Sequence, residues 1–155
     1  MTAGTPFRRP SLAWGVAAAV AVLAAAGALS WSGANEGVRP GDVEQVRLGQ
    51  AVYVEHCAAC HGARLEGQAA WQQRKPDGKL PAPPHDETGH TWHHADKQLF
   101  AVTKHGLASI AGAAYATDMP AYGDRLTNRE IWAVIAFIKS RWPLHIQDQQ
   151  GRLNR

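Results

Sequence analysis

Two cysteines and a histidine give the chain its clearest capacity for chemistry, in the pentapeptide Cys57-Ala58-Ala59-Cys60-His61. Two thiols three positions apart can each form a thioether with a different vinyl group on one porphyrin edge. The histidine that follows can then present an imidazole nitrogen to the iron. Cys57 and Cys60 are the only cysteines in the chain. The spacing therefore predicts one covalently bound c-type haem, with His61 as an axial ligand.

A C-x-x-C pair also serves other chemistries, and three of them stay open beside haem attachment. A redox dithiol needs a thioredoxin-like strand–turn–helix setting, which the sequence around Cys57 does not show. A zinc site needs four ligands, and the chain has no second cysteine pair. A disulfide across two residues closes a short, strained loop. The pattern favours the haem over all three.

The stretch from Gly49 to Gly62 resembles the haem-attachment end of a class I, monohaem cytochrome c. The resemblance implies a mostly helical electron carrier whose iron has a histidine and a methionine ligand. The loop Asp118-Met119-Pro120-Ala121-Tyr122-Gly123 resembles the axial-methionine loop of that family. By this resemblance His61 and Met119 are the metal ligands. An iron with both positions filled leaves no room for oxygen or peroxide, which favours a carrier over an enzyme.

The same resemblance implies a hydrogen bond behind the axial histidine. Family members use a proline carbonyl to accept the Nδ1–H of this histidine, which fixes its tautomer and raises its basicity as a ligand. The stretch Leu80-Pro81-Ala82-Pro83-Pro84 offers several such carbonyls, and the sequence does not select one. For Trp71 and Trp92, packing on the porphyrin edge, bonding to a propionate and ordinary loop packing all remain open.

An unusual group of histidines follows these prolines: His85, His90, His93 and His94. Such a group can bind copper or zinc, and one of His85, His93 and His94 could replace Met119 as the axial ligand. The general class I pattern has no counterpart for these residues. We expect a polar loop without a functional second metal site, with metal binding as the alternative.

Helix signals flank the motif on its N-terminal side and recur after the long loop. Asp42 is a suitable N-cap for a helix over 43–55. Gly49 inside that helix costs about 1 kcal/mol relative to alanine, so we expect a close contact at this position. A middle helix is expected from Asp96, as its N-cap, to His105.

A final helix is predicted from a capping box, Thr127-Asn128-Arg129-Glu130, and Pro143 ends it. By resemblance to the class I family, this helix crosses the first one, with Gly49 and Tyr53 meeting Val134 and Phe137. The expected fold is therefore mostly α and of the class I cytochrome c type. It has crossed N- and C-terminal helices, a middle helix and long haem-wrapping loops.

The first 31 residues predict an anchoring or targeting segment. Phe7-Arg8-Arg9 precedes an uncharged run over 12–31, which matches the roughly 20 apolar residues that span a bilayer. Trp14 and Trp31 bracket the run and favour a retained transmembrane anchor. Ala26-Gly27-Ala28 offers a cleavage site, so a removed signal peptide is the alternative. Both alternatives predict export of the haem domain to the periplasmic side. A retained anchor would leave it attached to the membrane, and a cleaved signal peptide would leave it soluble.

Composition and segment boundaries complete what the sequence predicts about domain organisation. The 155 residues carry 16 Lys and Arg against 13 Asp and Glu, and no basic stripe indicates a nucleic-acid partner. Four segments are predicted: an N-terminal anchor or signal segment at 1–31, a linker at 32–41, a cytochrome c domain at 42–145 and a polar C-terminal tail at 146–155.

The resemblance implies that the protein passes single electrons between respiratory-chain partners, such as a respiratory complex or an oxidase. Two alternatives stay open. One is a cytochrome subunit of a larger dehydrogenase or oxidase complex, and the other is a copper-handling protein with an accessory haem. A peroxidase is disfavoured because the chain has a single C-x-x-C-H motif.

Overall fold

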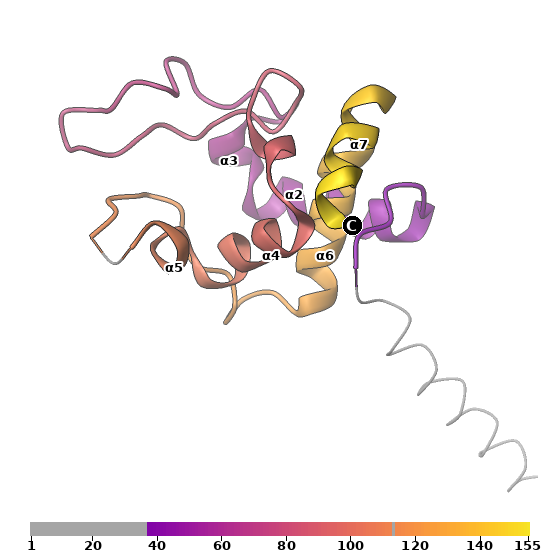
Figure 1. The fold of residues 1–155 in the computed structure, drawn as a ribbon. Helices are drawn as coiled ribbons and strands as arrows, with labels where there is room; N and C mark the ends of the chain where they lie inside the picture. The colour runs from indigo at the N-terminus through magenta and orange to yellow at the C-terminus, as the bar shows by residue number, and fades with distance from the viewer. Residues whose placement is uncertain (1–36, 113) are drawn as a thin grey trace, which may run out of the picture. The chain divides into compact units, whose positions relative to one another are not determined.

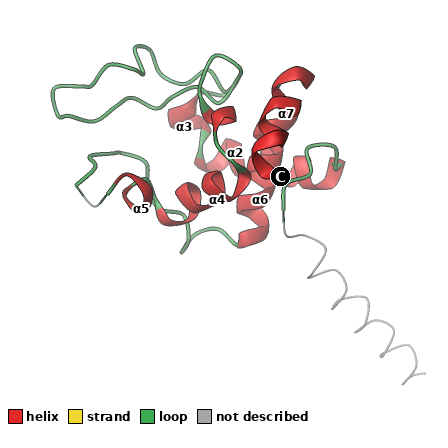
Figure 2. Ribbon diagram, viewed as in Figure 1, coloured by secondary structure: helices red, strands yellow, loops and turns green. Residues whose placement is uncertain are grey.

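The computed structural model describes residues 37–112 and 114–155, which fold as helices and loops with no strand in these ranges (Figure 2). The elements are α2 (Val43–His56), α3 (Ala58–His61), η1 (Thr91–His93), α4 (Asp96–His105), α5 (Ala108–Ala111), α6 (Asn128–Ser140), α7 (Leu144–Gly151) and η2 (Arg152–Asn154). The predicted mostly α fold with long loops is confirmed.

The N-terminal segment predicted over 1–31, and half of the linker after it, lie outside the described residues. Among the helices that the structure describes, none has the length and apolar character to cross a bilayer. The four predicted segment boundaries stay predictions.

Helices α2 and α6 pack against each other at Gly49. A Cβ atom at this glycine would lie 1.9 Å from the carbonyl oxygen of Ala133 and 2.9 Å from Cβ of Phe137. The rings of Tyr53 and Phe137 meet with centroids 5.4 Å apart, and Val134 is buried beside them. The close contact expected at Gly49, and the crossing of the first and last helices, are confirmed.

Both helices begin at the predicted caps. The Asp42 side chain accepts a hydrogen bond from the Gln45 backbone N–H at 3.0 Å. At the start of α6, Thr127 and Glu130 exchange the two bonds of a capping box. Each cap satisfies backbone donors that a helix leaves without partners, which is worth about 1 kcal/mol.

The predicted N-cap of the middle helix is wrong. Ala95 occupies the N-cap position, and Asp96 is the first residue of α4 without a side-chain capping bond. The Asp96 carboxylate instead accepts hydrogen bonds from Lys139 at 2.6 Å and Gln150 at 2.7 Å. Because a buried ammonium needs a paired charge, the carboxylate is drawn toward α6 and away from its own backbone. The helix ends where expected, at His105.

The sequence predicts a polar tail over 146–155, but in the structure α7 extends into this segment and packs on the domain. Gln150 has no exposed surface, and its side-chain amide donates to the His94 carbonyl at 3.0 Å as well as to Asp96. Ile146 is buried on the same helix. The C-terminal segment therefore holds the end of the histidine-rich loop.

Residues 62–95 leave α3 as a long excursion and return to α4 (Figure 1). The excursion folds back on itself near its base. Leu65 has a positive φ of 73°, and its carbonyl accepts from the backbone N–H groups of His85 at 2.7 Å and Asp86 at 3.3 Å. A Cβ atom on Gly67 would lie 2.4 Å from the nitrogen of Pro84. The base of the loop is thus closely packed although it has no regular structure.

Candidate haem-attachment site

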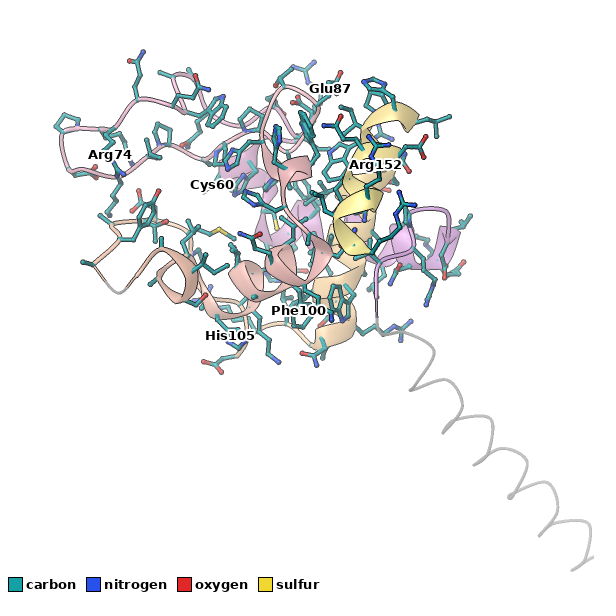
Figure 3. The ribbon with its side chains drawn as sticks, in the orientation of Figure 1. Cys60, Arg74, Glu87, Phe100, His105 and Arg152 are labelled. Carbon is teal, nitrogen blue, oxygen red and sulfur yellow. The ribbon has the colours of Figure 1, made fainter. Side chains whose placement is uncertain are left out.

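The C-x-x-C-H motif lies at the junction of α2 and α3. Cys57 ends α2, where its backbone N–H donates to Tyr53 at 2.9 Å, and its carbonyl accepts from the His61 N–H at 2.9 Å. Cys57 is half-buried and Cys60 is exposed, and both thiols are unpaired. Figure 3 shows Cys60 at α3, on the side from which the loop carrying Arg74 extends. The disulfide alternative is not formed.

The thiol of Cys57 is protonated at neutral pH. Burial raises its pKa to about 11, with a smaller contribution from a charge on Cys60. A redox dithiol or a zinc ligand requires an accessible thiolate, which a lowered pKa provides. The environment of Cys57 has the opposite effect, so it disfavours a redox dithiol and a zinc ligand.

His61 is nearly buried, at 8% exposed, and its ring is held by one hydrogen bond. Nδ1 lies 2.9 Å from the carbonyl oxygen of Pro83. A carbonyl only accepts, so Nδ1 carries the proton and Nε2 keeps its lone pair. Burial lowers the pKa of His61, against the opposing effect of the bond to Pro83, and the neutral ring is the form that binds metals. The structure thus selects Pro83 among the prolines of this stretch.

Behind His61 lies a second histidine ring. His85 stacks on His61 with ring centroids 4.0 Å apart and an angle of 20° between the planes. Its Nδ1 lies 2.7 Å from the hydroxyl of Thr91, and burial lowers its pKa well below the ordinary value. Ligands on opposite faces of a haem have the iron between them and cannot stack on one another. His85 is therefore on the side of His61 and does not fit the alternative in which it replaces Met119.

The other histidines of the loop form ring contacts. His90 stacks on Trp71 with centroids 5.4 Å apart and meets His94 edge-on at 5.4 Å, while His93 stacks on Trp92 at 3.7 Å. Within the described ranges, no three side chains of the His, Cys, Asp and Glu types are grouped to hold a metal ion. Trp71 and Trp92 therefore pack on histidines of their own loop, and a contact of either one with the haem stays a prediction.

Met119 lies in the loop between α5 and α6, and this loop is tied to the start of the motif. The Tyr122 hydroxyl donates to the carbonyl of His56 at 2.7 Å, and His56 directly precedes Cys57. Met119 itself is half-buried, and its backbone N–H donates to the Thr117 hydroxyl at 3.0 Å. The pKa of Tyr122 is raised by burial and then by the nearby cysteines. The loop with Met119 and the motif are thus neighbours, and the role of the sulfur stays a prediction.

An exposed ion-pair cluster joins this methionine loop to the long excursion. The Asp118 carboxylate binds the ammonium groups of Lys75, at 2.8 Å, and of Lys79. Hydrogen bonds from these lysines lower the pKa of Asp118 to about 2. Two loops that are remote in sequence therefore meet beside Met119, which follows Asp118 directly.

Comparison with known sequences decides the family. The sequence model described as cytochrome c matches residues 46–142, which is more than half of the chain. The chain belongs to the cytochrome c family. This cytochrome is 34% identical over 102 residues to the gluconate 2-dehydrogenase cytochrome c subunit of Pantoea cypripedii, and the alignment covers 62% of this chain. The chain spans 20% of the length of that relative. No solved structure matches it.

Membership of this family implies a covalent haem c, and the donor groups of this cytochrome fit one. Two unpaired thiols stand three positions apart, directly before a neutral imidazole whose Nδ1 is bonded to Pro83 and whose Nε2 is left for a metal. Tyr53 donates its hydroxyl to the Gly62 carbonyl at 2.8 Å, which fixes the chain directly after His61. Cys57, Cys60 and His61 are therefore the residues that would hold the group.

Sequence reasoning missed three contacts at the site of this cytochrome: the ring of His85 on His61, the Tyr122 bond to His56, and the Asp118 cluster. A histidine directly after a double proline could have drawn attention to His85, because the prolines fix the course of the chain before it. Nothing in the sequence pairs Tyr122 with His56, or Asp118 with Lys75, since both contacts join segments far apart in the chain.

Proposed function

We propose that this protein is a monohaem carrier of single electrons. Its haem is bound by thioethers from Cys57 and Cys60, and its iron by Nε2 of His61 and the sulfur of Met119. The proposal rests on the hydrogen bond of His61, whose Nδ1–H donates to the Pro83 carbonyl and leaves Nε2 available to bind the iron. A haem with two axial ligands supplies one-electron redox chemistry at a potential that the thioether raises.

The residues around the motif each have a defined task in this proposal. Pro83 keeps His61 neutral and in one tautomer, which raises its strength as a ligand. Tyr122 holds the methionine loop against the end of α2, where the sulfur of Met119 would be available to bind the iron. Ligands from both His61 and Met119 would leave the iron no position for peroxide or oxygen, which supports a carrier without enzymatic activity of its own.

Protein partners are proposed as the source and destination of the electrons. The exposed position of Cys60 supports electron transfer through a haem edge near the surface. The main proposal is a carrier between respiratory-chain proteins. The second candidate, a cytochrome subunit of a dehydrogenase complex, is supported by the name of the relative from Pantoea cypripedii. A copper-handling function lacks support, because the described loop histidines pack on rings.

The location is proposed from the sequence alone. An uncharged run over 12–31 behind Arg8 and Arg9 supports a membrane anchor with the haem domain on the periplasmic side. Removal of the same segment as a signal peptide, giving a soluble periplasmic protein, is the alternative. Sequencing the N-terminus of the mature protein distinguishes the two.

The full chain produced in a host that matures c-type cytochromes tests the function. Mass spectrometry should find one haem mass on the chain, and Cys57→Ala should lower the number of thioethers to one or none. The reduced visible spectrum should be that of a six-coordinate, low-spin c-type haem. A chain that carries no haem mass would contradict the proposal. Stoichiometric co-purification with a dehydrogenase subunit from the native membrane would favour the second candidate.

A further inference from the structure

We propose that His85 is a positioning residue that fixes the ring plane of His61. This inference rests on the proposed function, because it assumes that His61 binds the iron. The two rings stack at 4.0 Å with their planes 20° apart, so the flat face of His61 is covered by the flat face of His85. The bond from Nδ1 to Pro83 restrains only the edge of the ring.

A histidine ring needs this second restraint. The torsion that rotates an imidazole about its Cβ–Cγ bond has broad preferences, so rotamer energetics do not set the plane. A carbonyl acceptor also tolerates a wide range of directions around its oxygen. One hydrogen bond to Pro83 therefore leaves the plane of His61 loosely defined, and a stacked ring removes that freedom.

His85 is itself held on several sides, as a positioning group must be. Its backbone N–H donates to Leu65 at 2.7 Å, and its carbonyl accepts from Nε1 of Trp142 at 2.7 Å. Its ring nitrogen Nδ1 contacts the hydroxyl of Thr91 at 2.7 Å. The edge of Tyr53 faces the same ring, with centroids 6.5 Å apart. The backbone and the ring plane of His85 are thus both fixed.

The anchors of His85 are part of the buried interior. Leu65 and Trp142 are each 3% exposed and Thr91 is 8% exposed. Trp142 follows the end of α6, so its bond to His85 connects the loop to the helix pair. The plane of His61 is therefore fixed, through His85, by the core of the domain.

The plane of an axial imidazole matters because it selects the iron d orbital that overlaps with the ligand π system. In the ferric state this choice sets how unpaired spin is distributed over the porphyrin. Groups outside the coordination sphere commonly orient a ligand histidine in this way. The arrangement predicts that changes at His85 alter the electronic structure of the iron without changing its ligands.

The experiment compares His85→Ala, His85→Leu and His85→Phe in the mature ferric protein. Proton NMR of the haem methyl groups and low-temperature EPR both report the ligand plane, and the reduction potential is measured in parallel. His85→Ala and His85→Leu remove the flat surface, so the methyl shifts and the g values should move and the EPR signal should broaden. His85→Phe keeps a flat ring and should restore values close to those of the native protein.

His93→Ala is the matched control. His93 belongs to the same loop and stacks on Trp92, not on His61, so its removal should leave the methyl shifts and g values unchanged. The inference is overturned if His85→Ala and His85→Leu keep the native values, or if His85→Phe departs from them as far as His85→Leu does. Wild-type protein without covalent low-spin haem would instead refute the proposed function, before any His85 variant is measured.

Discussion

The α2–α6 helix pair and the two loops that meet beside Met119, residues 62–95 and 114–127, are stabilised in different ways. The helix pair has backbone bonds within each helix and an apolar interface around Gly49 and Tyr53. The loops have few regular backbone bonds and depend on single side-chain contacts. These include Trp142 to His85, Gln150 to His94 and Lys75 to Asp118.

This difference separates the determinants of the fold from those of the site. Burial of an apolar side chain contributes about 1.5–3 kcal/mol, and the helix interface combines several of them, so the pair sets the stability. A single hydrogen bond contributes about 0.5–1.5 kcal/mol net, but it fixes a direction. We therefore expect substitutions in the helix pair to change stability and substitutions in the loops to change the environment of His61 and Met119.

Met119→Ala should have the largest functional effect with little loss of stability. Removing the proposed sulfur ligand opens a coordination position, so the weak near-red band of the ferric protein should disappear and cyanide should bind readily. Met119→His should keep six-coordination and lower the potential, because imidazole stabilises ferric iron better than a thioether does. Spectra and potentiometry measure both. An unchanged potential in Met119→Ala would place the sixth ligand elsewhere.

Gly49→Ala should destabilise the helix pair. Its new Cβ atom would lie 1.9 Å from the Ala133 carbonyl oxygen, so α2 and α6 must separate. Overpacking of this kind costs about 1–3 kcal/mol, which offsets the better helix propensity of alanine. Denaturant unfolding followed by circular dichroism measures the change.

Gly151→Ala is the control for that prediction, because Gly151 also lies in a helix but no atom beyond its own helical turn stands within 4 Å of its added Cβ. This variant should be neutral or more stable than the native protein. Equal destabilisation by the two substitutions would show that the contact with Ala133 is not the cause.

Trp142→Phe should cost about 1 kcal/mol, because the part-buried carbonyl of His85 loses its donor. Amide hydrogen exchange should increase in residues 62–95 more than in α2, since the bond connects the loop to the core. Trp132→Phe, a change on α6 outside this contact, is the control. An equal increase of exchange in residues 62–95 and in α2 would contradict the prediction that this bond stabilises the loop more than the helix pair.

Asp118→Asn should have the smallest effect, because its ion pairs are exposed and screened by solvent. The pKa of Asp118 is lowered from the ordinary 3.8 to about 2. The carboxylate therefore stabilises the folded state above pH 3.8, and this contribution is lost as the pH falls toward 2. Thermal melts should show a small acid-side difference that added salt reduces. Asp77→Asn is the control, and an equal effect in both variants would exclude a specific role for Asp118.

Local signals explain why the helices were predictable. A cap such as Asp42 or Thr127 acts on backbone groups within three residues, and an apolar stripe repeats along one helix. Asp96 shows the limit of that reasoning. It stands where a cap is expected, but Lys139 and Gln150 bind its carboxylate, and neither partner is near it in sequence.

The sequence by itself determined the haem-binding motif and the caps at Asp42 and Thr127, because each depends on residues a few positions apart. The crossing of α2 and α6 joins distant residues and was predicted only from the resemblance to the cytochrome c family. Only the tertiary structure decided that Pro83 accepts from His61, that His85 covers the ring, and that Gln150 is buried. These contacts join segments whose approach is set by the folding of an irregular loop. A hydrogen bond or a ring contact between such segments leaves no periodic pattern along the chain, so it can be identified only from the folded structure.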